Sequence, residues 1–242
     1  MTLTDRQEKI LNILVKEYIR KAEPVGSEYL QKKYYPDICP ATIRNEMKKL
    51  TDEGYLYKSH ISSGRIPTDK SYRLFVDRIL ERGLNYHFDF DDLFNDNIDN
   101  IHFFIRSLTK HISDMTKSFV MGYLVEDDFF WKDGLLEVIK EPEFNDRDYL
   151  LDFVNFLERF ENDIDRLIES KNNSGINVFI GEENPFPKAE KFAVIVSSCN
   201  LSKNGRNKKS VISVLGPKRM SYDRNIGLMI SLLKELNKLK HG

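Results

Sequence analysis

The feature of this sequence that most constrains its fold is a change of hydrophobic period at Gly54. Before this residue, apolar side chains recur every three or four positions, which is the spacing of helices that bury one face. After it, residues 55–58 and 65–67 form short strand-like runs that are separated by the turn sequence Ser62-Ser63-Gly64. The change of period therefore predicts helices first and a β-hairpin after them.

Helix start and stop signals divide the first 54 residues into three helices. Ser27 can cap the second helix, and the third begins at Pro40 and ends at Gly54. A fourth helix follows the hairpin, with Thr68 in the capping position. Three helices, a hairpin and a helix in this order are typical of a winged helix, which is a relative of the helix-turn-helix.

The sequence changes character after residue 82. Residues 83–100 are acidic, rich in Asn and weakly periodic, so we interpret them as a linker. Strands interleaved with amphipathic helices then predict one α/β or α+β domain over 101–242, after an N-terminal domain over 1–82. The expected helices cover 101–119, 149–168 and 222–239, and the expected strands cover 120–125, 135–139, 176–180, 192–197 and 211–215.

Charge is distributed unevenly along the chain, although its formal net value is only -1. Residues 1–77 contain 14 basic and 11 acidic side chains, whereas residues 78–172 contain 11 basic and 22 acidic ones. Because an acidic segment repels phosphate, we expect any nucleic acid to contact the basic N-terminal part.

Two further features of the composition indicate where the protein acts. No apolar run approaches the ~18 residues that a membrane span needs, so no membrane contact is expected. Cys39 and Cys199 lack the spacing of a zinc site or a disulfide framework. A reducing, cytoplasmic environment is the simplest expectation.

The third helix is the candidate element for contacting DNA. Ile43, Met47 and Leu50 recur at i, i+4 and i+7, so they should face the core. The opposite face suits a major groove, because Arg can bind guanine, Asn can bind adenine and Lys can bind phosphate or guanine. From this helix alone, an ordinary solvated polar face is an equally good interpretation. The candidate residues on this face are Ala41, Thr42, Arg44, Asn45, Lys48 and Lys49.

The hairpin tip favours the DNA-binding interpretation further. It offers hydroxyl groups, a cation and a glycine that permits close approach to a ligand. Such a tip could contact phosphates or insert Arg65 into a minor groove, whereas the alternative is an exposed loop without a role. The candidate residues of the tip are His60, Ser62, Ser63, Gly64 and Arg65.

Five separated stretches, in the same order, resemble the heat-inducible transcription repressor family, HrcA. The resemblance implies a dimeric repressor of chaperone genes that binds an inverted repeat in double-stranded DNA, with a GAF-like C-terminal domain. We add Ser27, at the start of the second helix, to the DNA-binding candidates. The five stretches are EPVGSEYL at 23–30, PATIRNEMKKLTDEGYLYK at 40–58, SHISSGRIPTDKSYRLFVD at 59–77, INVFIGEENPFP at 176–187 and VISVLGPKRMSYDRNIGL at 211–228.

This sequence departs from the family pattern at two places. The family motif S-A-T-I-R-N falls on 40–45, but Cys39 and Pro40 replace the usual serines, so a helix-capping hydroxyl is lost. Family members are also longer, with a dimerisation insert in the GAF-like domain. Here the segment LLEVIKEPEF at 135–144, which resembles the one after that insert, follows 119–125 almost directly, so we expect the insert to be absent.

Without the insert, a homodimer must form through other surfaces. Two apolar stripes are candidates, although most of their residues are expected to cover the sheet of their own subunit. The stripes comprise Ile101, Phe104, Ile105, Leu108, Ile112 and Met115 in one helix and Ile226, Ile230 and Leu233 in the other.

Enzyme signatures are not found in the sequence, so we expect no catalytic residues, no cofactor and no metal. The local patterns predict an α+β protein that begins with a winged helix, and the resemblance implies that a GAF-like domain follows and that the protein acts as a homodimeric repressor. The resemblance implies chaperonin as a second partner. Two alternatives remain open, namely a winged-helix regulator whose GAF-like domain senses a small molecule, and a chaperone-interacting protein whose winged helix contacts proteins.

Overall fold

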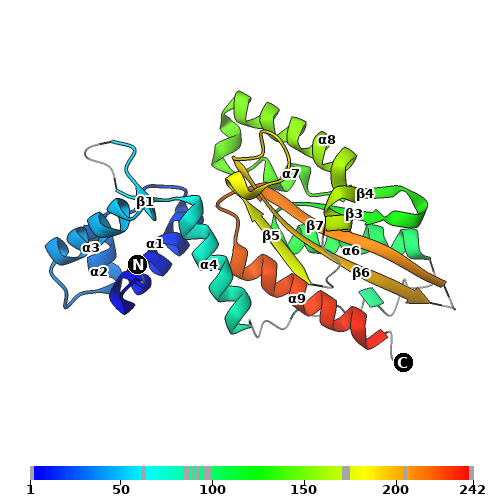
Figure 1. Ribbon diagram of the computed structural model, residues 1–242, viewed down its shortest axis with the longest axis horizontal. Helices are drawn as coiled ribbons and strands as arrows, with labels where there is room; N and C mark the ends of the chain where they lie inside the picture. The colour runs from blue at the N-terminus through cyan, green and yellow to red at the C-terminus, as the bar shows by residue number, and fades with distance from the viewer. Residues whose placement is uncertain are drawn as a thin grey trace. The chain divides into compact units, whose positions relative to one another are not determined.

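The computed structural model describes residues 3–60, 64–83, 88, 90, 93–94, 100–170, 175–203 and 206–239, without the side chains of 165–170, 201–203, 206–207 and 239. The chain divides into two compact units, Met1–Glu81 and Arg82–Gly242. Each unit is described separately below (Figure 1).

The first unit is a winged helix. Its first helix begins with a capping box, in which the Thr4 and Gln7 side chains each bind the backbone of the other residue. The three N-terminal helices enclose an apolar core, and a two-stranded antiparallel hairpin follows them. The elements are α1 (Asp5–Lys21), α2 (Ser27–Tyr34), α3 (Pro40–Asp52), β1 (Leu56–Tyr57), β2 (Ile66–Pro67) and α4 (Asp69–Arg82).

A buried carboxylate joins α1 to α2. Glu17 accepts hydrogen bonds from Arg20 at 2.7 Å, from Lys33 at 2.8 Å and from the Tyr29 and Tyr34 hydroxyls. Burial raises the pKa of this carboxyl, but the four hydrogen bonds outweigh burial and hold the pKa well below its usual range. Because α2 packs against α3, this cluster also helps to fix the position of α3.

The second unit is a five-stranded antiparallel sheet with the strand order β4-β3-β7-β6-β5. Its long hairpin, β6 and β7, lies next to β3 on one side and β5 on the other. Short 3-10 helices occur at Val125–Asp127, Pro142–Asn145 and Gly181–Glu183. The other elements are α6 (Ile101–Thr116), β3 (Phe119–Leu124), β4 (Phe129–Asp133), α7 (Leu135–Val138), α8 (Arg147–Ser170), β5 (Ile176–Ile180), β6 (Phe192–Lys203), β7 (Arg206–Pro217) and α9 (Tyr222–Leu239).

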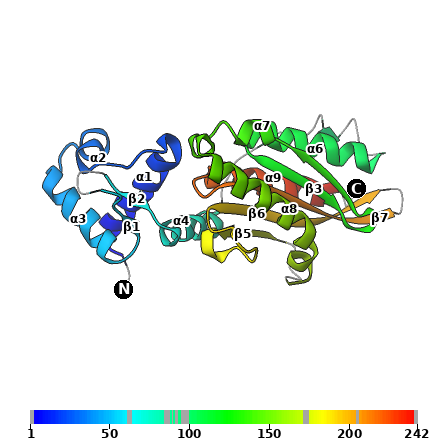
Figure 2. The same ribbon diagram turned by 90° about the horizontal axis from the view of Figure 1, so that it is seen from above.

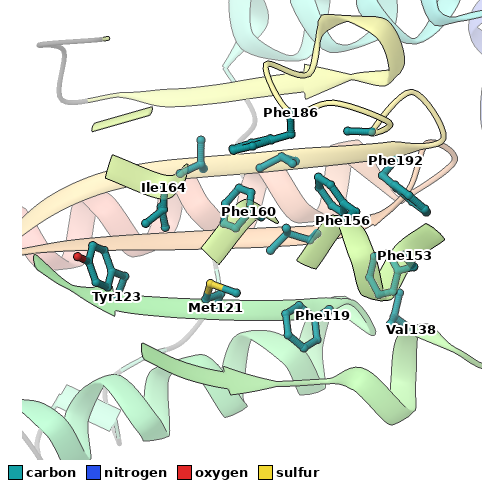
Figure 3. Packing of buried hydrophobic residues seen from close by; sticks show 14 of the residues in the cluster. Phe119, Met121, Tyr123, Val138, Phe153, Phe156, Phe160, Ile164, Phe186 and Phe192 are labelled. Carbon is teal, nitrogen blue, oxygen red and sulfur yellow. The ribbon is translucent and has the colours of Figure 1, made fainter. Parts of the chain in front are cut away.

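Helices cover both faces of this sheet. Figure 2 shows α8 on one face and α6 with α9 on the other. Alternate residues of β3 point to opposite faces, as the strand period requires. Met121 belongs to the aromatic core beneath α8, shown in Figure 3, whereas a Cβ on Gly122 would lie within 3 Å of Thr109 and Ile105 of α6. The two units are the winged helix and the GAF-like α/β fold that the sequence predicts.

One predicted strand is wrong. Residues 135–139 form the short helix α7 in place of a strand, and the strand beside β3 is β4. Gly134, with φ 86°, turns the chain between β4 and α7, and a Cβ there would lie 2.1 Å from the carbonyl oxygen of Ser118. Only Val138 of this helix is buried, so the apolar run that suggested a strand is mostly exposed.

Part of the segment interpreted as a linker packs within the second unit. Phe90 is buried, with its ring centroid 5.5 Å from that of His111, and the Phe94 ring lies 5.4 Å from Phe104. Most of residues 84–99 lie outside the described part of the chain.

The two apolar stripes proposed for dimerisation are mostly buried within their own unit, as expected. Phe104, Ile105 and Leu108 of α6 and Ile226 of α9 are inaccessible to a partner. None of the helices in the described part of the chain combines the length and the apolar composition that crossing a membrane requires.

Candidate nucleic-acid interface

Helix α3 buries one face and exposes a polar one, as its sequence predicts. Ile43, Met47 and Leu50 lie in the core of the first unit. Thr42 is half-buried at the edge of the opposite face. The remaining predicted contact residues, Ala41, Arg44, Asn45, Lys48 and Lys49, are all exposed.

The beginning of α3 lacks a side-chain cap. Cys39 occupies the N-cap position, is exposed and makes no capping hydrogen bond through its side chain. Pro40 takes the first helical position, where its missing N–H costs no hydrogen bond. The loss of a capping hydroxyl at this position is therefore visible in the structure.

Two of the three cations on α3 form weak ion pairs in the described part of the chain. Arg44 lies 3.8 Å from Glu28 of α2, and Lys49 lies 3.2 Å from Glu46. Exposed pairs of this kind contribute ~0–1 kcal/mol, so phosphate can replace the carboxylate at little cost. Within the described residues, Lys48 has no ion-pair partner.

Arg65 lies at the base of the hairpin. Its backbone forms an antiparallel bridge with Val25, with N···O distances of 2.9 and 2.8 Å. Its Nε donates a hydrogen bond to Thr51 Oγ1 at 3.0 Å, and that hydroxyl donates to the Met47 carbonyl at 2.8 Å. The guanidinium is thus attached to the C-terminal turn of α3, which places the hairpin base beside the exposed face of that helix.

Gly64 is required by the protein's own backbone. A Cβ at this position would lie 2.5 Å from both the carbonyl carbon and the oxygen of Val25. The sequence suggested that Gly64 allows a ligand to approach the backbone. In the structure, Gly64 instead allows the backbone of Val25 to approach the hairpin.

The structure describes the remaining candidates in part. His60 is exposed, whereas Ser62 and Ser63 lie outside the described residues. Ser27 does not cap α2, because Gly26 is the N-cap and Ser27 is the first helical residue. Ser27 is half-buried, and its neighbour Glu28 pairs with Arg44, so this turn of α2 lies beside α3.

Thr51 helps to position Arg65, and the sequence alone did not indicate this role. It is separated from Arg65 by 14 positions, and the two meet only because the chain reverses at the hairpin. Nothing in the local pattern around Thr51 distinguishes it from an ordinary residue of the last helical turn.

Comparison with known proteins adds an independent line of evidence. The family model described as HrcA protein C terminal domain matches residues 85–226. The heat-inducible transcription repressor HrcA of Natranaerobius thermophilus is 28% identical over 340 aligned positions, which cover 98% of this chain and 96% of that protein. The corresponding protein of Alkaliphilus metalliredigens is 26% identical, with coverage of 100% and 99%.

The lengths of these alignments support the expectation that this chain lacks the family's insert. The alignment with the Natranaerobius protein is 340 positions long, whereas this chain has 242 residues, so the relative contains residues that this chain lacks. A shorter match, to the HrcA of Thermodesulfovibrio yellowstonii, is 52% identical over 82 residues, which are 34% of this chain and 24% of that protein.

A solved structure has the same fold. It is the crystal structure of a hypothetical protein at 2.2 Å resolution. It superimposes on this chain with a TM-score of 0.74 at 22% identity, and the match covers 98% of both chains. At this identity the likeness establishes the architecture alone.

Proposed function

The chain belongs to the HrcA family, and from this premise we propose that it represses transcription by binding double-stranded DNA at an inverted-repeat operator. The family is one of transcription repressors and not of enzymes. The genes that it controls are, on this proposal, those of chaperones, and it acts in the cytoplasm.

The observation that carries the proposal is the exposed face of α3 beside the hairpin base. Arg44 and Asn45 have the donors and acceptors that recognise guanine and adenine in a major groove. Lys48 and Lys49 supply charge for phosphate, because both are exposed and the ion pair of Lys49 with Glu46 is weak. The bond from Arg65 to Thr51 holds the hairpin against the end of the same helix.

Repression follows from occupancy of the promoter. One winged helix contacts a single half-site, and an inverted repeat presents two half-sites related by a two-fold axis. A homodimer matches this symmetry and binds both half-sites together, which excludes the transcription machinery from the same DNA. We propose chaperonin as the second partner, which maintains the repressor in its active, folded form.

The first prediction tests α3 directly, on DNA sites identified by genome-wide mapping of the bound protein. The Arg44→Ala, Asn45→Ala double variant should lose ~1–3 kcal/mol of operator binding per contact and discriminate less at one or two base positions. Lys16→Ala, an exposed cation on α1, is the matched control and should bind like wild type. Unchanged affinity and base preference in the double variant would show that α3 does not contact the bases.

A further inference from the structure

Exposed apolar side chains gather on α7 and the first half of α8. Leu151 and Val154 of α8 are 49% and 41% exposed, and Leu135 and Leu136 of α7 are 43% and 74% exposed. The core does not require these residues, because the inner face of α8 is already filled by Phe153, whose neighbours in Figure 3 include Val138 of α7. Val138 and Phe153 belong to one buried cluster, so α7 and the first half of α8 share part of the same core.

The charges on α8 flank this apolar pair in a specific pattern. Arg147, Leu151, Val154 and Glu158 follow one another at spacings of 4, 3 and 4 residues, so all four lie on one face of the helix. All four are exposed. In the described part of the chain, neither Arg147 nor Glu158 has an ion-pair partner.

Arg147 lies where the electrostatics of its own helix are unfavourable to a cation. It is the first residue of α8, where the helix dipole favours an acidic side chain and disfavours a cation. Asp146, whose side chain accepts hydrogen bonds from the backbone N–H groups of Asp148 and Tyr149, offsets part of this cost within the subunit, and a carboxylate from a partner would offset more.

We propose that this face of α8 is a homodimer interface, in which two α8 helices pack antiparallel about a two-fold axis between residues 152 and 153. Leu151 then faces Val154 of the partner subunit, and Arg147 faces the partner's Glu158, because the two pairs share one midpoint in the sequence. The two charges are about 16 Å apart along the helix, so both ion pairs lie at the rim of an apolar centre.

The charge pattern favours a second copy of this chain over another partner. A helix face with one cation at one end, two apolar side chains in the middle and one carboxylate at the other end is complementary to itself only when reversed, which is what a two-fold axis does. The inference rests on the proposed function in one respect, namely that an inverted repeat calls for a two-fold protein.

The test is a series of charge-reversal variants of the full chain. The dissociation constant of the dimer is measured for each variant by analytical ultracentrifugation without DNA. Arg147→Glu and Glu158→Arg should each weaken the dimer by about tenfold, because each places like charges opposite one another twice. The double variant should return the dissociation constant to within about threefold of wild type, since both pairs re-form with reversed sign. Lys110→Glu, on α6, is the matched control and should leave the dimer unchanged.

Folding and DNA binding are followed separately. Arg147→Glu introduces the charge that a helix N-terminus prefers, so its unfolding temperature should not fall. Leu151→Asp should abolish the dimer with native circular dichroism retained. The proposed interface is refuted if the wild-type protein is monomeric, or if neither Arg147→Glu nor Glu158→Arg changes the dissociation constant of the dimer. A dimer that responds as stated but binds no DNA leaves the interface standing and refutes the proposed function.

Discussion

At the scale of single residues, two buried or half-buried polar groups determine how the winged helix is held together. Glu17 has four hydrogen-bond donors from α1 and α2, and Arg65 joins the hairpin to α3 through Thr51. Both groups are charged, but only Arg65 lies beside the proposed DNA contact face. Their substitution should therefore separate stability from binding.

The second prediction concerns Glu17 and pH. Because its pKa is lowered in the folded state, the carboxylate stabilises the fold fully above the unfolded value of 4.5, and this contribution is lost as the pH falls below it. Glu17→Gln should lower the free energy of unfolding by ~1–3 kcal/mol at pH 7, with a difference from wild type that shrinks in acid. Urea unfolding from pH 7 to pH 3 measures this, with the exposed Glu23→Gln as control. A constant difference across that range would contradict the assignment.

The third prediction separates the charge of Arg65 from its position. Arg65→Ala should weaken operator binding and reduce the slope of log affinity against log salt by about one, as expected when one phosphate-neutralising cation is lost. Thr51→Val keeps the cation but removes the hydroxyl that holds it, so it should weaken binding with the slope unchanged. If Arg65 enters a minor groove, the loss should depend on A·T content beside the site. Wild-type binding by both variants at every salt concentration would remove Arg65 from the interface.

At the scale of elements, the hairpin depends on a contact with the segment before α2. Val25 pairs with Arg65, and the backbone at Val25 leaves no room for a side chain at Gly64. Val25 and the pair Gly64-Arg65, which the sequence shows in two separate motifs, therefore belong to one structural unit.

The fourth prediction follows from that contact. Gly64→Ala should force the hairpin base away from Val25, lower the free energy of unfolding by ~1–3 kcal/mol and weaken operator binding. Gly26→Ala is the matched control, because nothing lies within 4 Å of a Cβ there and its φ is −89°. Thermal unfolding and operator titration of the two variants should differ clearly. Equal behaviour would mean that the hairpin base moves freely.

At the scale of the whole molecule, the second unit contains a buried ion cluster that joins two segments far apart in the sequence. Arg219 is held by Glu143, at 2.5 and 2.9 Å, and by Glu141, which connects the segment before α8 to the one before α9. Burial lowers the pKa of the guanidinium, but the bonds to Glu143 and Glu141 outweigh burial and raise it. Removing one partner by substitution would leave a buried charge without its counter-ion, so Arg219, Glu141 and Glu143 are expected to be strongly interdependent.

The fifth prediction concerns heat. A repressor of marginal stability loses its folded fraction steeply as temperature rises, so operator binding should fall cooperatively over a modest range, and added chaperonin should restore it. Operator affinity measured across temperature, with and without chaperonin, tests both parts. If binding persists to the global unfolding temperature and ignores chaperonin, control by this route is refuted and sensing of a small molecule by the GAF-like unit becomes the better hypothesis.

The sequence by itself determined the order of elements in the first unit and the exposed face of α3. Both features follow from local periodicity. Helix geometry alone places Ile43, Met47 and Leu50 on one face, and all three are buried. The same reasoning failed at 135–139, where a short apolar run is compatible with a strand or a helix and the turn at Gly134 decides between them.

Only the tertiary structure decided which distant residues meet. The contact of Gly64 with Val25, the bond from Arg65 to Thr51 and the exposure of Leu151 depend on how elements pack, and packing joins positions that share no local pattern. An amphipathic helix such as α8 shows in sequence how wide its apolar stripe is, but not how much of that stripe its own sheet will cover. The exposed face of α8, with Arg147 and Glu158 at its ends, could be identified only from the packing of the helix on the sheet.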